Sequence, residues 1–477
     1  MSKNPLEPDA AEIRRLVQLI AERVVSHQSS VAAAPASWTP RTDYGNYISE
    51  ALPEHPSSEA DTLDVVLGPL LEGGVNTTSP GNLSYVNGGG LLLASLAQLL
   101  ASCTNRYVTY WGAAPGYAEL EAQVVRWFCE IVGYPPEAFG VLTTGGSLAN
   151  LSALVAARQH LLGETFLDGV IYASTEVHHS IAKAASVAGF PRANLRMIAV
   201  DHRFRIDPEA LSRAVAEDRA KGLRPFFVVG NAGTTSSGAI DDLCALREVA
   251  TSEQLWLHVD AAYGGFFMLT AVGRQRLNGL HLADSVTLDP HKSLFMPYGS
   301  GCLLVREPAH LRRAHEVHSN YIADISGESA DAGHVDFADL SPEMTREFRG
   351  LKLWLPLKLL GVGAFRRALE EKLELTRHAA TALREIPDVE ILAEPELSIV
   401  AFRVTRSELD DVGNDRLNQA VLESVNQRGR VHLSSTTLGG RVALRICALS
   451  FRVHVTQILW CLEDLGAALV ALRELRC

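Results

Sequence analysis

The chain has 477 residues, of which 47% are apolar and 21% are charged, proportions typical of an ordinary folded protein. Its formal net charge is −12 and no run of Lys and Arg stands out, so the composition disfavours a nucleic-acid partner. The seven cysteines form no CxxC pair, which argues against a metal site or a disulfide framework and fits a reducing compartment.

The first 85 residues predict a helical arm. The opening MSKNPLEPDA lacks the basic and apolar regions of a signal peptide. AEIRRLVQLIAERVVSHQ (11–28) repeats its apolar residues at helical spacing, and Pro, Ser and Thr dominate the residues that follow. The longest apolar run, at 91–103, is too short to span a bilayer. We therefore expect a cytoplasmic protein with no membrane partner.

Between residues 86 and 350, short apolar segments alternate with helical ones. The segments that indicate buried strands are GVIYAS (169–174), LRMIAV (195–200), PFFVVG (225–230), LWLHVD (255–260), DSVTLD (284–289) and GCLLV (301–305). Helical patterns at 208–222 and 240–253 lie between them. This alternation is typical of an α/β domain with a mostly parallel sheet.

The remaining residues indicate a smaller α+β domain. Residues 351–386 form one long helical pattern, and the segments at 389–404 and 442–449 predict a further set of strands. The expected units are an N-terminal arm (1–85), a large domain (86–350) and a small C-terminal domain (351–477).

Polar side chains stand where three of the predicted strands end. Asp260 closes one strand, and His291 and Lys292 come just after another. Thr234 and Thr235 follow a third. The carboxyl ends of parallel strands form the ligand crevice of an α/β sheet, so the acid and the lysine could meet there. A structural ion pair is the commoner explanation. The alternative is a pyridoxal-phosphate site, in which the lysine bonds to the cofactor aldehyde and the carboxylate faces the pyridine nitrogen.

A phosphate-binding turn is predicted by LTTGGSLANLSALVAAR (142–158). Gly145 and Gly146 leave backbone amides accessible, and Ser147 offers a hydroxyl where a helix begins. Such a turn is common by itself, but here it accompanies the acid and the lysine. HHSIAKA (178–184) adds two histidines. Each alone is more often a surface or capping residue, although one of them could stack on a cofactor ring.

Taken together, these motifs resemble those of the group II pyridoxal-phosphate amino-acid decarboxylases. The segments that carry the resemblance are TTGGSLAN, VHHSIAKA, NAGTTSSGAIDDL, HVDAAYGG and DPHKSLF, and the likeness extends from SPGNLSYVNGGG to ALRICALSFR. The family includes aromatic-amino-acid, glutamate, histidine and diaminobutyrate decarboxylases. The resemblance implies an aspartate-aminotransferase-like (type I) fold, with a mostly parallel seven-stranded sheet and a small C-terminal α+β domain. It also implies pyridoxal 5'-phosphate as cofactor and a homodimer clasped by the N-terminal arm, with active sites between subunits.

The resemblance assigns roles to individual cofactor-site residues. Lys292 would be the Schiff-base lysine, His291 its neighbour near the phosphate, Asp260 the partner of the pyridine nitrogen, Ala262 a packing residue against the ring, His178 the residue stacked on the opposite ring face, Gly146 and Ser147 the phosphate holders, and Thr235 a cofactor neighbour. Thr234 is nearly as good a choice as Thr235. Asp289 stands where many members of the family have Asn, and its role is left open.

Three further sets of residues concern the reaction. The polar segment 312–337 predicts a loop, and Tyr321 matches the family tyrosine that protonates the quinonoid carbon after carbon dioxide leaves. Arg445 matches an arginine that faces the substrate carboxylate, the alternative being an internal ion pair. Tyr85 and Trp111 match aromatic pocket residues, but their neighbours differ from the aromatic-specific pattern. The expected substrate is therefore an L-amino acid of open identity, and the expected product its amine.

Other functions on the same fold stay open at this stage. One is a decarboxylation-dependent aldehyde synthase, although Tyr321 favours simple decarboxylation, since relatives that oxidise carry Phe there. Another is a different pyridoxal-phosphate carbon–carbon lyase or a transaminase. A non-catalytic scaffold is the least favoured, because Lys292, Asp260 and His178 are all present.

Overall fold

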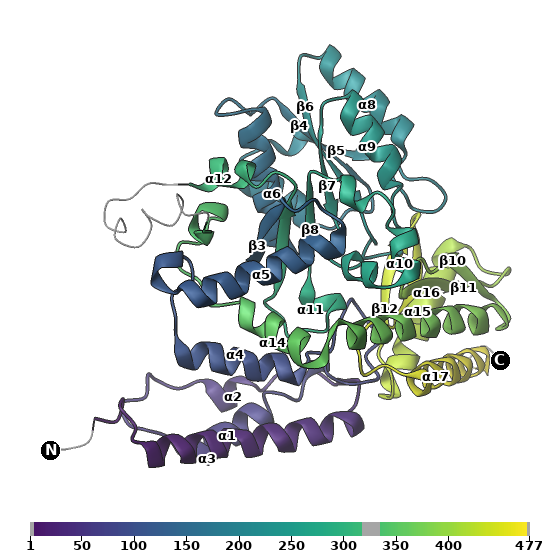
Figure 1. The fold of residues 1–477 in the computed structure, drawn as a ribbon. Helices are drawn as coiled ribbons and strands as arrows, with labels where there is room; N and C mark the ends of the chain where they lie inside the picture. The colour runs from purple at the N-terminus through teal and green to yellow at the C-terminus, as the bar shows by residue number, and fades with distance from the viewer. Residues whose placement is uncertain (1–3, 317–333, 475–477) are drawn as a thin grey trace.

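The computed structural model describes residues 4–316 and 334–474 and is built around a seven-stranded sheet (Figure 1). Its strands are β3 (Phe139–Thr143), β4 (Gly169–Ser174), β5 (Leu195–Ile198), β6 (Arg224–Asn231), β7 (Trp256–Asp260), β8 (Ser285–Leu288) and β9 (Gly301–Val305). They lie side by side in the order β3-β9-β8-β7-β6-β4-β5. Only β9 runs against its neighbours, so the mostly parallel sheet is confirmed.

Helices cover this sheet on both sides, as parallel strands require. The helices of the large domain are α4 (Leu92–Thr104), α5 (Pro115–Val132), α6 (Gly146–Leu161), α7 (Ser180–Val187), α8 (Pro208–Ala220), α9 (Leu243–Ser252), α10 (Ala271–Arg276), α11 (Pro290–Ser293) and α12 (Ala309–His315). Helix α6 crosses the middle of the sheet, where it contacts β6, β7, β8 and β9. Its first residue therefore stands at the centre of the edge where the parallel strands end.

The long helical pattern at 351–386 is two helices rather than one. Helix α14 (Gly350–Leu360) ends at Gly361, whose φ of +72° favours glycine, and α15 (Val362–Arg384) begins directly after it. Helix α14 packs against α4 and α5 of the large domain. Helix α15 leads into the small domain (Figure 1).

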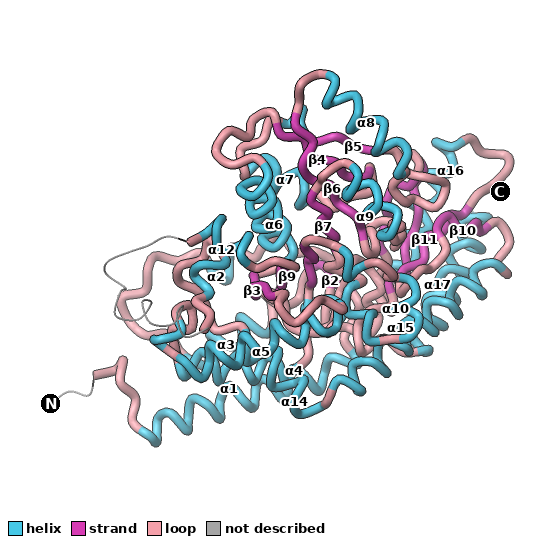
Figure 2. The backbone as a smooth tube through the Cα atoms, turned by 45° about the horizontal axis from the view of Figure 1, so that its top comes forward, coloured by secondary structure: helices cyan, strands magenta, loops and turns pink. Residues whose placement is uncertain are grey.

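The small domain has a four-stranded antiparallel sheet in the order β10-β11-β13-β12. Figure 2 shows β10 and β11 beside α15 and α17. Its elements are β10 (Val389–Ala393), β11 (Ile399–Val404), α16 (Asp411–Gln427), β12 (Ser434–Leu438), β13 (Arg441–Cys447) and α17 (Val455–Glu474). By length and composition α17 could cross a membrane. However, its Ile458, Cys461 and Leu465 are buried in the core of this domain, which is the environment of a core helix.

The N-terminal arm lies along the outside of the molecule (Figure 1). It contains α1 (Ala10–Ser30), the short helix α2 (Gly45–Ile48) and α3 (Glu59–Leu67). The predicted helix at 11–28 is confirmed. No residue of α1 is buried, and its Ile13, Val17 and Ile20 are all more than 40% exposed. The proposed domain boundaries at 85 and 350 stay predictions.

The segment 81–91, which we call the connecting segment, joins the arm to α4 and runs between the two domains. Leu83 accepts a hydrogen bond from Cys447 N and donates one to the His432 carbonyl, both in the small domain. At the other end Leu91 N donates to the carbonyl of Phe295, in the large domain. The connecting segment is therefore bonded to both domains.

Candidate active site

A cavity of about 370 Å³ opens at the edge where the parallel strands of the large sheet end. The predicted residues that line it are Gly146, Ser147, His178, Thr235, Asp260, Ala262, His291 and Lys292, and Asp289 is among them too. They lie at or just after the ends of five different strands, and these ends meet at one edge because the five strands run in the same direction.

Lys292 enters the cavity from the short helix that follows β8. Pro290 occupies the first position of this helix, where its missing N–H costs nothing, and turns the chain from strand to helix. The Lys292 Nζ atom lies 3.0 Å from Oδ2 of Asp289, which is only 3% exposed. The other oxygen, Oδ1, is buried without a hydrogen-bond partner in the described part of the chain, so a bound group could satisfy it. Asp289, whose role the sequence left open, is thus a buried partner of the lysine.

His291 is held in one tautomer by the backbone. Its Nδ1 lies 2.6 Å from the carbonyl oxygen of Ser300, which can only accept, so Nδ1 carries the proton. Its Nε2 faces Asp289 Oδ2 at 3.6 Å. The imidazole therefore stands beside the carboxylate, next to the lysine.

Asp260 ends β7 and is 8% exposed. Oδ1 accepts a hydrogen bond of 3.1 Å from the backbone N–H of Ala262, and Oδ2 accepts one of 2.9 Å from Asn150 Nδ2. Both donors stabilise negative charge on the carboxylate. A buried carboxylate at this edge, held in a fixed orientation, suits a cationic partner such as a protonated ring nitrogen.

His178 lines the same cavity and is an exposed residue. Its Nδ1 lies 2.8 Å from Ser180 Oγ. The surrounding protein withdraws the ring from water and lowers the pKa of His178 below the ordinary histidine value, against the opposing effect of nearby Asp260. A neutral imidazole at a cavity wall can stack on an aromatic ring. Its neighbour His179 is exposed and does not line the cavity.

The turn between β3 and α6 provides the anion-binding part of the cavity. Gly145 and Gly146 begin the 16-residue helix α6, so its free N–H groups and the Ser147 side chain are at the cavity wall. Thr143 Oγ1 donates 3.0 Å to the carbonyl of Gly145 and braces the turn. A Cβ atom at Gly301 would lie 2.5 Å from Gly145 Cα, so β9 packs directly on this turn.

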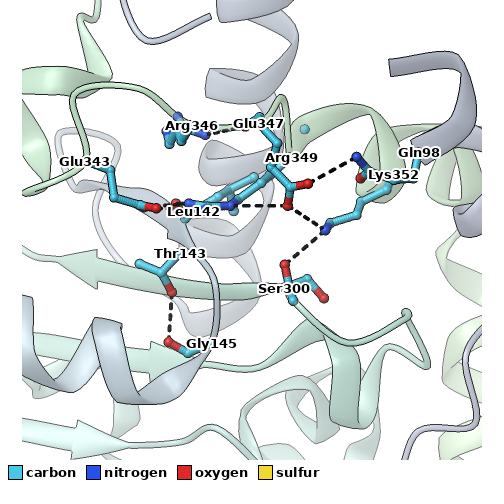
Figure 3. A network of polar contacts seen from close by, with 12 residues as sticks. Gln98, Leu142, Thr143, Gly145, Ser300, Glu343, Arg346, Glu347, Arg349 and Lys352 are labelled. Atoms are coloured by element: carbon cyan, nitrogen blue, oxygen red, sulfur yellow. Dashed lines mark hydrogen bonds and ion pairs between the residues drawn. The ribbon is translucent and has the colours of Figure 1, made fainter. Parts of the chain in front are cut away.

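A buried ionic network supports the same turn from behind (Figure 3). Arg349 donates 3.0 Å to the carbonyl of Leu142, just before the turn, and is paired at 2.6 Å with Glu343. Lys352 donates 2.9 Å to the carbonyl of Gly299, one residue before the carbonyl that holds His291. Both cations lie on or beside α14, so this helix fixes the anion-binding turn without touching the cavity.

Thr234 and Thr235, the two threonines after β6, have different surroundings. The Thr234 hydroxyl is buried and lies 2.7 Å from Ser237 Oγ. Thr235 is exposed at the cavity wall. Thr235 is therefore the better placed of the two to meet a bound molecule.

The residues expected to bind substrate lie outside the cavity lining. Trp111 stacks on His334 with ring centroids 3.7 Å apart. Arg445 is 3% exposed, and its guanidinium donates to Ser434 Oγ at 3.3 Å and to the Tyr85 carbonyl at 3.4 Å. No carboxylate pairs with Arg445 among residues 4–316 and 334–474, and burial lowers its pKa. Tyr321 lies outside the described residues.

Asn150 is a site residue that sequence reasoning missed. It lies four residues after Gly146 on α6, hence on the same face, and it is 1% exposed. An amide side chain within a mostly apolar helical run was the available signal. Its bond to Asp260 shows that α6 contributes to the acid end of the cavity as well as to the anion end.

The donor set fits pyridoxal 5'-phosphate. A lysine, a buried carboxylate and a helix N-terminus stand around one cavity, where an aldehyde, a ring nitrogen and a phosphate could each find a partner. Fold and cavity together thus define a pyridoxal-phosphate enzyme.

Comparison with known proteins identifies the family. The chain belongs to the pyridoxal-dependent decarboxylases, because the model of their conserved domain matches residues 43–405. It is 34% identical to the aromatic-L-amino-acid decarboxylase of Bacillus atrophaeus, over 96% of this chain and 95% of that protein. It is 28% identical to the phenylacetaldehyde synthase of Arabidopsis thaliana, over 92% of both.

Solved structures agree with this assignment. The Oryza sativa TDC with PLP and tryptamine superposes with a TM-score of 0.93 at 25% identity, over 99% of this chain and 100% of that one. The Catharanthus roseus tryptophan decarboxylase in complex with L-tryptophan gives 0.89 at 26% identity, over 98% and 99%. The protein is therefore a pyridoxal-phosphate-dependent carboxy-lyase with the type I fold.

Proposed function

We propose that the protein converts an aromatic L-amino acid to its amine and carbon dioxide. The convergence of Lys292, Asp260 and His178 on one cavity is the observation that carries the decarboxylase function. The aromatic substrate class is supported by the relatives, which include an aromatic-L-amino-acid decarboxylase and a tryptophan decarboxylase of Oryza sativa that is 29% identical over 92% of this chain.

When bound, the cofactor supplies an aldehyde that links to amines and a ring that accepts the electron pair left by carbon dioxide. Lys292 would hold the cofactor through that aldehyde, and its amine would be the group that the substrate amine replaces. Asp260, whose carboxylate is held by two hydrogen bonds, would face the ring nitrogen and favour its protonated form. His178 would stack on one face of the ring and Ala262 would pack against the ring, since both line the cavity.

Two residues handle the substrate itself. Arg445 would bind the substrate carboxylate, a role supported by the lack of an acidic partner for it in the described ranges. Tyr321 returns a proton to Cα after the carboxylate has left, and His178 or a water can serve as relay. The Trp111 and Tyr85 side chains contribute to the substrate pocket together with the partner subunit.

The test is a screen for carbon dioxide and amine release over the aromatic amino acids, with leucine, glutamate and 2,4-diaminobutyrate as comparators. Aromatic amino acids should react at least about tenfold faster than these comparators, because a smaller or polar side chain loses apolar contacts with the pocket and each lost contact lowers kcat/KM. Borohydride should fix the cofactor to Lys292, and Lys292→Ala should abolish both trapping and turnover. Faster release from glutamate or diaminobutyrate would reject the substrate class, and wild-type enzyme without trapping would reject the role of the lysine.

The identity to phenylacetaldehyde synthase favours one second candidate, an aldehyde product. This reaction consumes oxygen and releases ammonia and peroxide along with carbon dioxide. Wild-type enzyme should give stoichiometric amine without oxygen uptake, whereas Tyr321→Phe should divert product toward aldehyde. Unchanged amine output in Tyr321→Phe would remove the acid role of this residue.

We also propose a cytoplasmic homodimer with its active sites between subunits. The exposed apolar residues Ile13, Val17 and Ile20 of α1 would be covered by a second copy of the chain. Sedimentation should show a dimer, and Val17→Glu combined with Ile20→Glu should weaken it. A monomeric wild-type enzyme with full activity would reject the dimer.

A further inference from the structure

Asn150 is the hub of a buried hydrogen-bond network that reaches both Asp260 and His178. Its Nδ2 lies 2.9 Å from Asp260 Oδ2 and 2.9 Å from Ser180 Oγ. Its Oδ1 lies 2.6 Å from Thr287 Oγ1 and 3.0 Å from His258 Nε2. Both hydrogens and both lone pairs of the amide are therefore used.

The charge on Asp260 fixes the orientation of this amide. A carboxylate only accepts hydrogen bonds, so the amide NH2 must face Asp260 and the amide oxygen must face the other way. His258 must then donate through Nε2. The hydrogen bond at the other ring nitrogen of His258 is consistent with this tautomer. Ser285 Oγ accepts from Trp256 Nε1 at 2.8 Å and donates its own hydrogen to His258 Nδ1 at 2.8 Å. Complete burial lowers the pKa of His258 to about 4, so it stays neutral.

The second hydrogen of the amide decides the tautomer of His178. Because Asn150 donates to Ser180 Oγ, that hydroxyl is free to give its own hydrogen to His178 Nδ1, 2.8 Å away. The backbone N–H of Ser180 also points at Nδ1, at 3.3 Å. Nδ1 is thus an acceptor, and the proton of the neutral ring lies on Nε2.

We propose that Asn150 is a positioning residue that sets the hydrogen-bonding state of the whole cavity: it stabilises the charge on Asp260 and, through Ser180, leaves His178 with its proton on Nε2. The inference rests on the proposed roles of Asp260 and His178. Without the amide, the carboxylate would lose a donor and the imidazole could rotate or change tautomer. The charged groups that also act on His178 are Asp260, Lys292, His179 and Asp289, and they are unchanged by the variants below.

The two arms can be separated by mutation. Asn150→Asp keeps the size but cannot donate while ionised, and it places a second carboxylate beside Asp260. Ser180→Ala removes only the arm to His178, and Ser180→Thr keeps the hydroxyl. The matched control is Asn418→Asp in the small domain, because Asn418 is equally buried at 0% exposed and also bonds through both amide atoms.

The experiment uses holoenzyme and follows the pH titration of the bound cofactor's absorbance, together with kcat and KM. Asn150→Asp should shift that titration by about 1 pH unit or more, as like charges at a shared site do, whereas Asn418→Asp should not. Ser180→Ala should leave the titration in place and lower kcat about tenfold or more at unchanged KM, and Ser180→Thr should recover most of the loss.

Three results would overturn the proposal. An unshifted titration in Asn150→Asp would remove the arm to Asp260, and equal rates in Ser180→Ala and Ser180→Thr would remove the arm to His178. Equal shifts in Asn150→Asp and Asn418→Asp would show general loosening instead. Trapping of the cofactor on Lys292 in the wild type is the separate readout for the proposed function, so the two failures are distinguishable.

Discussion

Replacing Asp289 with Asn should tighten cofactor binding, although the residue lies within the cofactor cavity. Its Oδ2 lies 3.0 Å from Lys292 Nζ, and their side chains are 4% and 20% exposed. Removing one partner of a buried pair costs 3–5 kcal/mol, and the partial exposure of this lysine reduces that to about 2 kcal/mol. The cofactor competes for Nζ, so the holoenzyme does not carry this loss.

A difference of about 2 kcal/mol corresponds to about 30-fold tighter binding of the cofactor by Asp289→Asn. Removing a negative charge near the anion-binding turn acts in the same direction. The assay titrates apoenzyme with pyridoxal 5'-phosphate and follows tryptophan fluorescence. Asp284→Asn is the matched control at the opposite end of β8, where Asp284 pairs with Arg247 at 3.0 Å, and it should leave the affinity unchanged. Equal or weaker binding by Asp289→Asn would refute the reasoning.

Three further outcomes follow from buried contacts. Burial lowers the pKa of His258 to about 4, so the stability that its neutral form contributes is fully present above the ordinary value of about 6.5 and is lost as the pH falls toward 4. Over that window, urea unfolding should show that the wild type loses about 3 kcal/mol more than His258→Gln. Equal losses in the two proteins would contradict this prediction. Glu121→Gln, which breaks a fully buried ion pair, should lower the free energy of unfolding by about 3 kcal/mol, whereas exposed Glu119→Gln should cost under about 1 kcal/mol. Gly301→Ala should push the anion-binding turn aside and weaken cofactor binding at least about tenfold in the same fluorescence titration, while Gly116→Ala, with open space around it, should bind as wild type does.

The sequence predicts most strands of the large domain. These strands are buried on both faces, and short continuous apolar runs between helical patterns indicate strands rather than helices. The strand at Phe139–Thr143 was missed, since its sequence runs straight into the glycine turn and reads as part of that motif. The strand at Ser434–Leu438 was missed because it is a polar edge strand, SSTTL. The break at Gly361 was hidden by apolar helical spacing that continues on both sides of it.

The site shows a similar division. Lys292, Asp260 and the Gly145–Ser147 turn could be predicted because strand ends meet at one edge whatever the side chains do. The network around Asn150 could not, since it depends on which hydroxyls and amides face one another across α6, β7 and β8. The pairing of Asp289 with the lysine likewise depends on side-chain direction, so the sequence showed only that the residue was unusual.

The connecting segment has a mechanical consequence. Gly88 packs so closely on the backbone carbonyls of His291 and Lys292 that a Cβ atom would collide with both. A few residues earlier, Leu83 is hydrogen-bonded to the small domain on both sides. A displacement of the small domain would therefore act on a stretch of backbone that packs directly against the main chain of Lys292, and only the side chain of the lysine itself lies between this contact and the reacting nitrogen.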